Sequence, residues 1–164
     1  MSRKQTLGVE CFDKIKYFNE KKILIKIWDT AGQEKYAVMA KNYYQRAHGI
    51  ILTFALTERS SFNNLKNWLN SLNDATSQEI PLIIIGNKKD LIDEREISEE
   101  EIKEKAKELN IEYFETSAKE NLYIDEAFEK IIDRVFNNNY LKKTYAFSLN
   151  EIDKEKNEGY YCSC

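Results

Sequence analysis

The chain has few cysteines, few glycines, no block of basic residues and no long apolar run. Two of its three cysteines, Cys162 and Cys164, are too close together and too peripheral to staple a fold, which fits a reducing, cytosolic compartment. Lysine and arginine number 25 against 28 acidic residues, so we expect no nucleic acid as a partner. The longest apolar runs, residues 49–56 and 81–86, are far shorter than the roughly 20 residues of a spanning helix. We therefore expect neither a secreted nor a membrane-spanning protein.

What the sequence does contain is enough apolar residues for one core, at 42% of the chain, arranged as alternating strands and helices. Strand-length apolar segments predict strands over residues 9–18, 23–28, 49–56, 82–86 and 113–116. Helical spacing predicts helices over residues 62–72 and 124–135. Ser98 and Glu101 form a capping-box pattern, which predicts the start of a third helix that runs to about Leu109.

The order of these elements predicts the fold class. Strands and helices alternate over residues 49–137, which is typical of an α/β protein with a doubly wound, mostly parallel sheet. Residues 9–28 instead predict an antiparallel hairpin at one sheet edge, with a polar turn at residues 19–22. The periodicity stops near Asn138. We therefore expect one partial domain over residues 1–137, followed by a flexible tail over residues 138–164.

A polar segment, DTAGQE, follows directly on the strand predicted for residues 23–28. It would project from the carboxyl edge of the sheet, where open α/β sheets bind ligands. There the carboxylate of Asp29 can hold Mg²⁺ through water, and Gly32 lets a backbone N–H approach a phosphate oxygen. Gln33 can orient an attacking water. The alternative interpretation of this segment, taken alone, is a plain turn.

Two further polar segments end the next strands. In the first, NKKD, Asp90 can accept two hydrogen bonds from guanine, whereas adenine would leave the carboxylate unpaired. Asn87 would tie neighbouring loops together, and the alkyl stem of Lys88 would cover one face of the base. The second segment is ETSAK, whose Ser117, Ala118 and Lys119 could close the other side of the purine. A solvated charged loop is the alternative for NKKD alone, but three such segments at three strand ends favour a binding site.

These three segments, in this order and spacing, resemble the Ras superfamily of GTP-binding proteins from Thr6 to about Phe136. The stretch YYQRAHG at residues 43–49 and the start of the helix after Ser61 look like the Rab branch. The resemblance implies the small G-protein fold, which is a P-loop NTPase fold, with GTP or GDP and Mg²⁺ as ligands. It implies that Thr6 ligates Mg²⁺ and that Trp28 and Tyr43 face effectors.

The resemblance also implies a lipid anchor and a set of protein partners. Cys162 and Cys164, in the final CSC, resemble the Rab double-prenylation signal, and two lipid chains anchor a protein stably where one binds marginally. The implied partners are effectors, an exchange factor, a GTPase-activating protein and a prenylation escort. The implied location is the cytoplasmic face of an intracellular membrane, with a cytosolic pool.

One family element has no counterpart in these 164 residues. The phosphate-binding loop reads G-x-x-x-x-G-K-S/T, and no two of the five glycines have that spacing. By resemblance, the first strand, this loop and the first helix are absent. We therefore expect the strands at residues 23–28 and 49–56 to be left unpaired at the centre of the sheet, and the chain to fold poorly alone and to bind GTP weakly. Two smaller departures are Ala55, where Rabs usually have aspartate, and Cys11, near a usual phenylalanine.

Two functions stay open at the level of sequence. In the first, the gene encodes a Rab GTPase that hydrolyses GTP in vesicle-mediated protein transport, and the given sequence lacks its first coding segment. In the second, the chain is a non-catalytic relic without a P-loop that acts as a membrane-tethered interaction protein. In-frame genomic sequence upstream that encodes a strand and a P-loop would favour the first.

Overall fold

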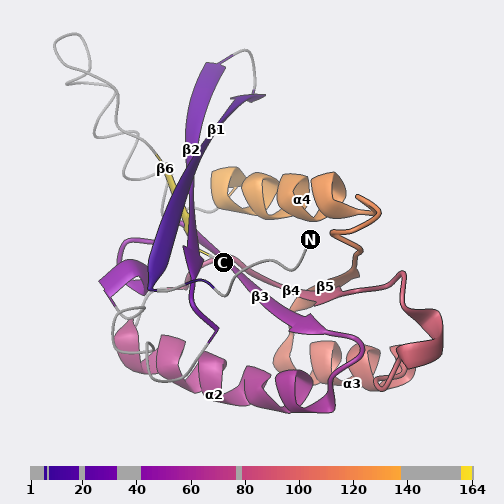
Figure 1. The fold of residues 1–164 in the computed structure, drawn as a ribbon. Coiled ribbons are helices and arrows are strands. Elements are labelled where there is room, and N and C mark those ends of the chain that lie inside the picture. The colour runs from indigo at the N-terminus through magenta and orange to yellow at the C-terminus, as the bar shows by residue number, and fades with distance from the viewer. Residues whose placement is uncertain are drawn as a thin grey trace, which may run out of the picture.

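The computed structural model describes residues 6, 8–18, 21–32, 42–76, 79–137 and 160–163, and over these residues the chain forms one sheet covered by helices on both faces (Figure 1). The sheet has six strands in the order β1-β2-β6-β3-β4-β5. Their bounds are β1 Val9–Phe18, β2 Lys21–Thr30, β3 Gly49–Ala55, β4 Leu82–Asn87, β5 Glu112–Glu115 and β6 Tyr160–Ser163. The helices are α2 Arg59–Ala75, α3 Glu99–Leu109 and α4 Ile124–Asn137, with a short 3-10 turn, η2, at Ile92–Glu94.

The predicted hairpin and the predicted parallel sheet are both confirmed. Strands β1 and β2 pair antiparallel from Val9 opposite Thr30 to Phe18 opposite Lys21. Strand β3 pairs parallel with β4, and β4 pairs parallel with β5. The chain is therefore an α/β protein with a doubly wound, mostly parallel sheet that carries one antiparallel edge hairpin.

Two apolar clusters hold the layers together. Helices α2 and α3 lie below the sheet in Figure 1 and α4 lies above it. The lower cluster includes Leu52, Phe54 and Leu65, and the upper one includes Ile51, Ile83 and Ile131. Alternate residues of β3 thus enter opposite clusters, because successive side chains of a strand point to opposite faces of the sheet. All six of these side chains are buried, as expected for the mostly apolar central strands β3 and β4.

Helix α3 begins where the capping-box pattern predicts. The Ser98 side chain accepts a hydrogen bond from Glu101 N at 3.2 Å, and the Glu101 carboxylate accepts one from Ser98 N at 3.0 Å. The helix ends at Leu109, and Asn110 follows it as a C-cap with a left-handed backbone (φ 53°). Helix α2 begins at Arg59, earlier than the expected residue 62. Within the described residues, no helix is both long and apolar enough to cross a bilayer.

The centre of the sheet corrects two expectations. Strand β6 lies between β2 and β3 and runs parallel to both, so the predicted vacancy between these strands is wrong over Ile25 to Trp28 and at Gly49 and Ile50. The tail assignment is likewise wrong for Tyr160–Ser163. The physical reason is that two facing strand edges present unpaired N–H and C=O groups, which any extended segment of suitable register can satisfy. Residues 138–159 lie outside the described part of the chain.

Candidate functional site at the carboxyl edge of the sheet

The end of strand β4 joins three loops through Asn87. Its side-chain Oδ1 accepts hydrogen bonds from Ala118 N at 3.0 Å and from Thr116 Oγ1 at 3.4 Å. Its backbone carbonyl accepts one from Leu56 N at 2.9 Å. The loops that follow β3, β4 and β5 therefore meet at this residue.

The chain turns sharply after Asn87. Lys88 has a left-handed backbone with φ of 68°, and its side chain is exposed. The next residue is fixed from the neighbouring strand, because Lys89 N donates a hydrogen bond to the Thr116 carbonyl at 2.9 Å. The side chain of Lys89 lies with its Nζ 4.9 Å from the centroid of the Tyr123 ring. This turn places the following aspartate beside the loop after β5.

Asp90 is held by two residues of the ETSAK segment. The fully buried Ser117 donates a hydrogen bond from its Oγ to Asp90 Oδ1 at 2.5 Å, and Lys119 Nζ lies 3.7 Å from Asp90 Oδ2. The Ser117 hydroxyl in turn accepts a hydrogen bond from Glu120 N at 3.1 Å. The Asp90 side chain is 11% exposed. The Ser117 hydrogen bond, helped by the charge of Lys119, lowers the pKa of Asp90, so this carboxyl group is a fixed anion that can accept hydrogen bonds.

A second acidic residue of the same segment, Glu115, stabilises the loop between β4 and α3. Arg95 donates hydrogen bonds from both terminal nitrogens to the two Glu115 oxygens, at 3.0 and 2.5 Å. Lys89 Nζ lies 3.8 Å from the same carboxylate, whose side chain is 9% exposed. A bidentate arginine contact of this kind fixes orientation as well as charge. The loop that carries Asp90 is thus held to Glu115 at the end of β5 by Lys89 near its start and by Arg95 near its end.

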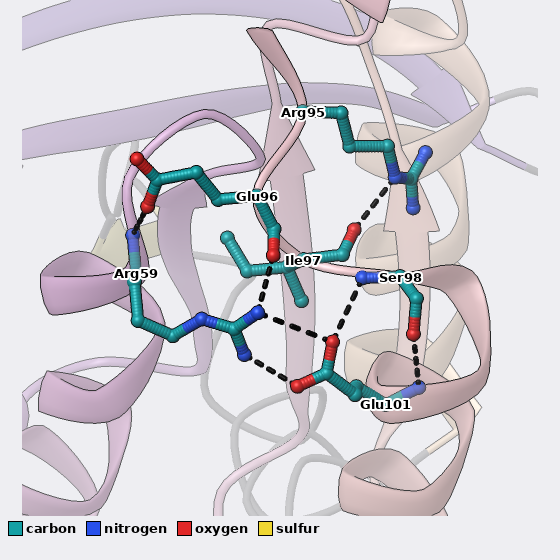
Figure 2. Close-up of polar contacts among 6 residues, drawn as sticks. All are labelled: Arg59, Arg95, Glu96, Ile97, Ser98 and Glu101. Carbon is teal, nitrogen blue, oxygen red and sulfur yellow. Dashed lines mark hydrogen bonds and ion pairs between the residues drawn. The ribbon is translucent and has the colours of Figure 1, made fainter.

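Figure 2 shows how the far end of this loop is tied to the start of α2. The Arg59 guanidinium donates hydrogen bonds to the Glu101 carboxylate and to the Glu96 carbonyl, and Arg59 N donates one to Glu96 Oε2 at 2.6 Å. Arg95 Nε donates to the Ile97 carbonyl at 2.6 Å. No sequence pattern pointed to Arg59, Arg95 or the role of Glu115, because charged residues far apart in the chain give no periodic signal.

The other part of the edge brings two predicted Mg²⁺ ligands together. Thr6 Oγ1 donates a hydrogen bond to Asp29 Oδ2 at 3.0 Å, at the open end of the β hairpin where the start of β1 lies opposite the end of β2. The backbone here is tied by Ala31 N, which donates to the Gly8 carbonyl at 2.8 Å. Gly32 is exposed, and Gln33 lies outside the described residues.

The remaining predicted functional residues are the two aromatic residues expected to face effectors and the two C-terminal cysteines. The rings of Trp28 and Tyr43 lie with their centroids 4.9 Å apart, so the two proposed effector-facing aromatics are neighbours. Cys162 lies within strand β6 and not in a free tail. Cys164 lies outside the part of the chain that the structure describes.

The geometry first defines a class of protein. An open α/β sheet whose carboxyl-edge loops converge on an anchored carboxylate and a side-chain amide is typical of a nucleotide-binding protein. Comparison with known proteins then gives the family, because residues 1–137 match the model of the Ras family. The chain therefore belongs to the Ras family.

Its relatives include Ras-related proteins from plants and animals. It is 40% identical over 136 residues to Ras-related protein RGP2 of Oryza sativa subsp. japonica, and the aligned stretch covers 83% of this chain and 63% of the relative. It is 39% identical over 128 residues to Ras-related protein Rab-3C of Bos taurus, which covers 78% and 56%. It is 42% identical over 123 residues to Ras-related protein RABD2b of Arabidopsis thaliana, which covers 75% and 61%. The resemblance to Rab-type small GTPases is thus confirmed, and the chain spans about three fifths of the length of these relatives.

Proposed function

We propose that this chain is part of a Rab-type GTP-binding switch in vesicle-mediated protein transport, on the cytoplasmic face of an intracellular membrane with a cytosolic pool. The observation that carries the proposal is the group formed by Asn87, Asp90 and Ser117, in which a fixed carboxylate lies among three converging loops. The Ras-family match supports guanine as the base and Mg²⁺ as the metal.

The residues at the base side fit a guanine ring. A carboxylate offers two acceptors side by side, and guanine presents two adjacent donors, its N1–H and its exocyclic amine. Asp90 already accepts from Ser117 and lies close to Lys119, so its charge is held in place before any ligand arrives. The exposed Lys88 would cover the base, and the backbone of Ala118 would line its far side. Asp90 would thus set the specificity for guanine.

The residues at the metal side also fit their ligand. A hydroxyl and a carboxylate oxygen are ligands that Mg²⁺ accepts, and Thr6 Oγ1 and Asp29 Oδ2 lie 3.0 Å apart. Thr6 would bind directly and Asp29 through water, while Gly32 would present its backbone N–H to a phosphate. The ion would neutralise charge on the phosphates. Gln33 would orient the attacking water, and a GTPase-activating protein would supply an arginine.

The phosphate side limits what these 164 residues do alone. The sequence has no G-x-x-x-x-G-K-S/T, which in P-loop proteins supplies backbone N–H groups and a lysine for the β- and γ-phosphates. Each charged contact that is missing costs about 2–5 kcal/mol, or roughly 30-fold or more in affinity. We therefore propose that this stretch recognises the base but gains little from the phosphates.

The lipid anchor and the protein partners complete the proposal. Cys162 and Cys164 would each form a thioether when the thiolate displaces diphosphate from an isoprenyl diphosphate and the thiol proton passes to solvent. A prenylation escort would present the chain for this step. Trp28 and Tyr43 would face effectors, and an exchange factor would act on the bound nucleotide.

Binding of a nucleoside without phosphates tests the base site separately from the missing loop. We would titrate the chain with guanosine, adenosine and GDP in Mg²⁺ and follow backbone amide chemical shifts by NMR. Guanosine should shift the amides near Asp90 and Ser117, adenosine should not, and GDP should bind within about tenfold of guanosine. Equal responses to guanosine and adenosine would contradict the guanine assignment. A GDP advantage above about a thousandfold would show that another segment binds the phosphates.

A matched pair of variants tests the role of Asp90. Asp90→Asn replaces an acceptor by an amide donor, so guanosine shifts should disappear and xanthosine, which has a carbonyl in place of the exocyclic amine, should bind better. Asp93→Asn makes the same chemical change on the exposed turn η2, and it should leave guanosine binding unchanged. Equal loss in both variants would mean that Asp90 has no specific contact with the base.

One observation supports the second candidate, a non-catalytic interaction protein tethered to a membrane. Strand β6 pairs with both β2 and β3, so a segment of the chain itself fills the position between these two strands. A protein of this kind would fold and bind partners without nucleotide. It would show no difference between guanosine and adenosine in the titration above, whereas the switch would.

A further inference from the structure

Strand β1 forms one edge of the sheet, and within the described residues no strand pairs with its outer side (Figure 1). Ala31 N donates a hydrogen bond to the Gly8 carbonyl, and bonded residues alternate along an antiparallel ladder, so the even-numbered residues of β1 bond to β2. The odd-numbered residues from 9 to 17 therefore direct their N–H and C=O groups towards the open edge. An edge of this kind can pair with a further strand.

The side chains of β1 combine exposed apolar residues with free charges of both signs. Phe12 is 53% exposed and Ile15 is 52% exposed. Glu10 and Lys14 are exposed, and in the part of the chain that the structure describes neither takes part in a hydrogen bond or an ion pair. These two residues share one face of the strand about 13 Å apart, so they cannot pair within one chain. A second strand could supply the missing partner for both.

We propose that β1 pairs antiparallel with β1 of a second copy of this chain, with Phe12 opposite Phe12 at the two-fold axis. In this register Glu10 of each copy lies opposite Lys14 of the other, and Val9 lies opposite Ile15. Opposite charges and apolar residues that face one another across two strands are stabilising. The two Phe12 side chains would lie close together, because facing residues that exchange no hydrogen bonds have the nearest side chains.

Neighbouring registers of the same edge are less favourable. The open backbone groups belong to odd-numbered residues, so odd-numbered residues of the two copies must face one another. An axis at Asp13 would place two aspartates opposite each other, and an axis at Lys14 would place two lysines opposite each other. Like charges in this position are destabilising. An axis at Cys11 would leave both Glu10 and Lys14 without an opposite charge. The register centred on Phe12 avoids all three faults.

Variants that exchange charge test this pairing in solution. We would measure the average mass of the full chain by sedimentation equilibrium, and it should rise from one chain towards two between about 10 µM and about 1 mM, since a single strand edge makes a small, weak interface. Glu10→Lys and Lys14→Glu each place like charges opposite one another, so each should weaken association by about tenfold or more. An equimolar mixture of the two variants should associate again, because both pairs of the mixed dimer then join a lysine to a glutamate.

A matched pair of variants on α3 controls for net charge. Glu104→Lys and Lys107→Glu make the same changes at exposed positions of a different element, and they should leave association unchanged, alone or mixed. A parent chain that stays monomeric at about 1 mM would overturn the proposal and leave this edge to a different protein. A mixture of Glu10→Lys and Lys14→Glu that associates no better than either variant alone would overturn it as well.

Disulfide trapping tests the register. Phe12→Cys should cross-link two copies through residue 12 under oxidising conditions, because facing residues at such a position have Cα atoms about 4.5 Å apart, within reach of a disulfide. Lys14→Cys should form no link between the two residues 14, which would lie about 13 Å apart. Mass spectrometry of the linked peptides identifies the cysteines involved. A link at residue 14 without one at residue 12 would contradict this register. None of these measurements uses nucleotide or lipid, so failure of the proposed GTP-binding function would leave their result unaffected.

Discussion

Gly49 is the point at which the central strand β3 comes closest to helix α4, and Gly49→Ala tests that packing. The added Cβ would lie 2.7 Å from Val135 Cγ2 and 3.1 Å from Ile131 Cγ1. Carbon atoms in contact lie about 3.5–4.0 Å apart, so α4 would have to move by roughly an ångström. Val135 is 7% exposed and Ile131 is fully buried, so neither side chain has free space to occupy.

The expected magnitude follows from two opposing terms. Overpacking of a well-packed core costs about 1–3 kcal/mol. Alanine is better than glycine in a strand by about 0.5–1 kcal/mol. The net loss in the free energy of unfolding should therefore be about 1–2 kcal/mol, which lowers the midpoint of a urea transition by about 0.5–1 M.

A matched control and a second substitution make this prediction sharp. Gly32→Ala is the same chemical change at an exposed glycine with no heavy atom within 4 Å of the new Cβ, and it should alter stability by less than about 0.5 kcal/mol. Val135→Ala makes room beside residue 49. The double variant should therefore lose less free energy of unfolding than the two single variants lose in total, by about 1 kcal/mol or more. If Gly49→Ala is as stable as the parent, α4 does not pack on β3 as the structure describes.

Two further predictions concern the polar contacts around the loop between β4 and α3. The Arg59 hydrogen bond holds the pKa of Glu101 at about 2, so its contribution to stability is present above the ordinary value of 4.5 and is lost as the pH falls from 4.5 towards 2. Thermal melts should show that the penalty of Glu101→Gln shrinks over that window, and a penalty that stays constant would contradict the role of the Arg59 contact. Glu115→Gln leaves Arg95 without its charged partner at a site with little solvent exposure, so the free energy of unfolding measured in urea should fall by about 1.5–3 kcal/mol. Glu108→Gln removes a charge from an exposed ion pair and should lower it by less than about 1 kcal/mol. Similar losses in both variants would contradict a special role for Glu115.

The sequence was informative wherever structure is local or periodic. The strand over residues 9–18 and the helix cap at Ser98 were predicted to within a residue or two, because alternation and capping depend on neighbours in the chain. The convergence of Asn87, Asp90 and Ser117 was also predictable, since parallel strands end at the same edge of a sheet.

The contacts that were missed join distant parts of the chain. Strand β6 is four residues long and follows a polar stretch, so nothing local marks it as a strand; its place depends on the edges that β2 and β3 present. The Arg59 contact with Glu101 depends on the start of α2 lying beside the start of α3, which periodicity does not specify. The hydrogen bond between Thr6 and Asp29 was foreseen only as a shared ligand role and not as a direct contact.

The central position of β6 also has a consequence for the order of folding during protein synthesis. The hairpin β1–β2 and the unit β3–β4–β5 are both synthesised before strand β6, which lies between them in the sheet. Until then, each unit carries an open inner edge, and such edges pair with other chains. We therefore expect the inner edges of β2 and β3 to stay open until residues 160–163 have been synthesised.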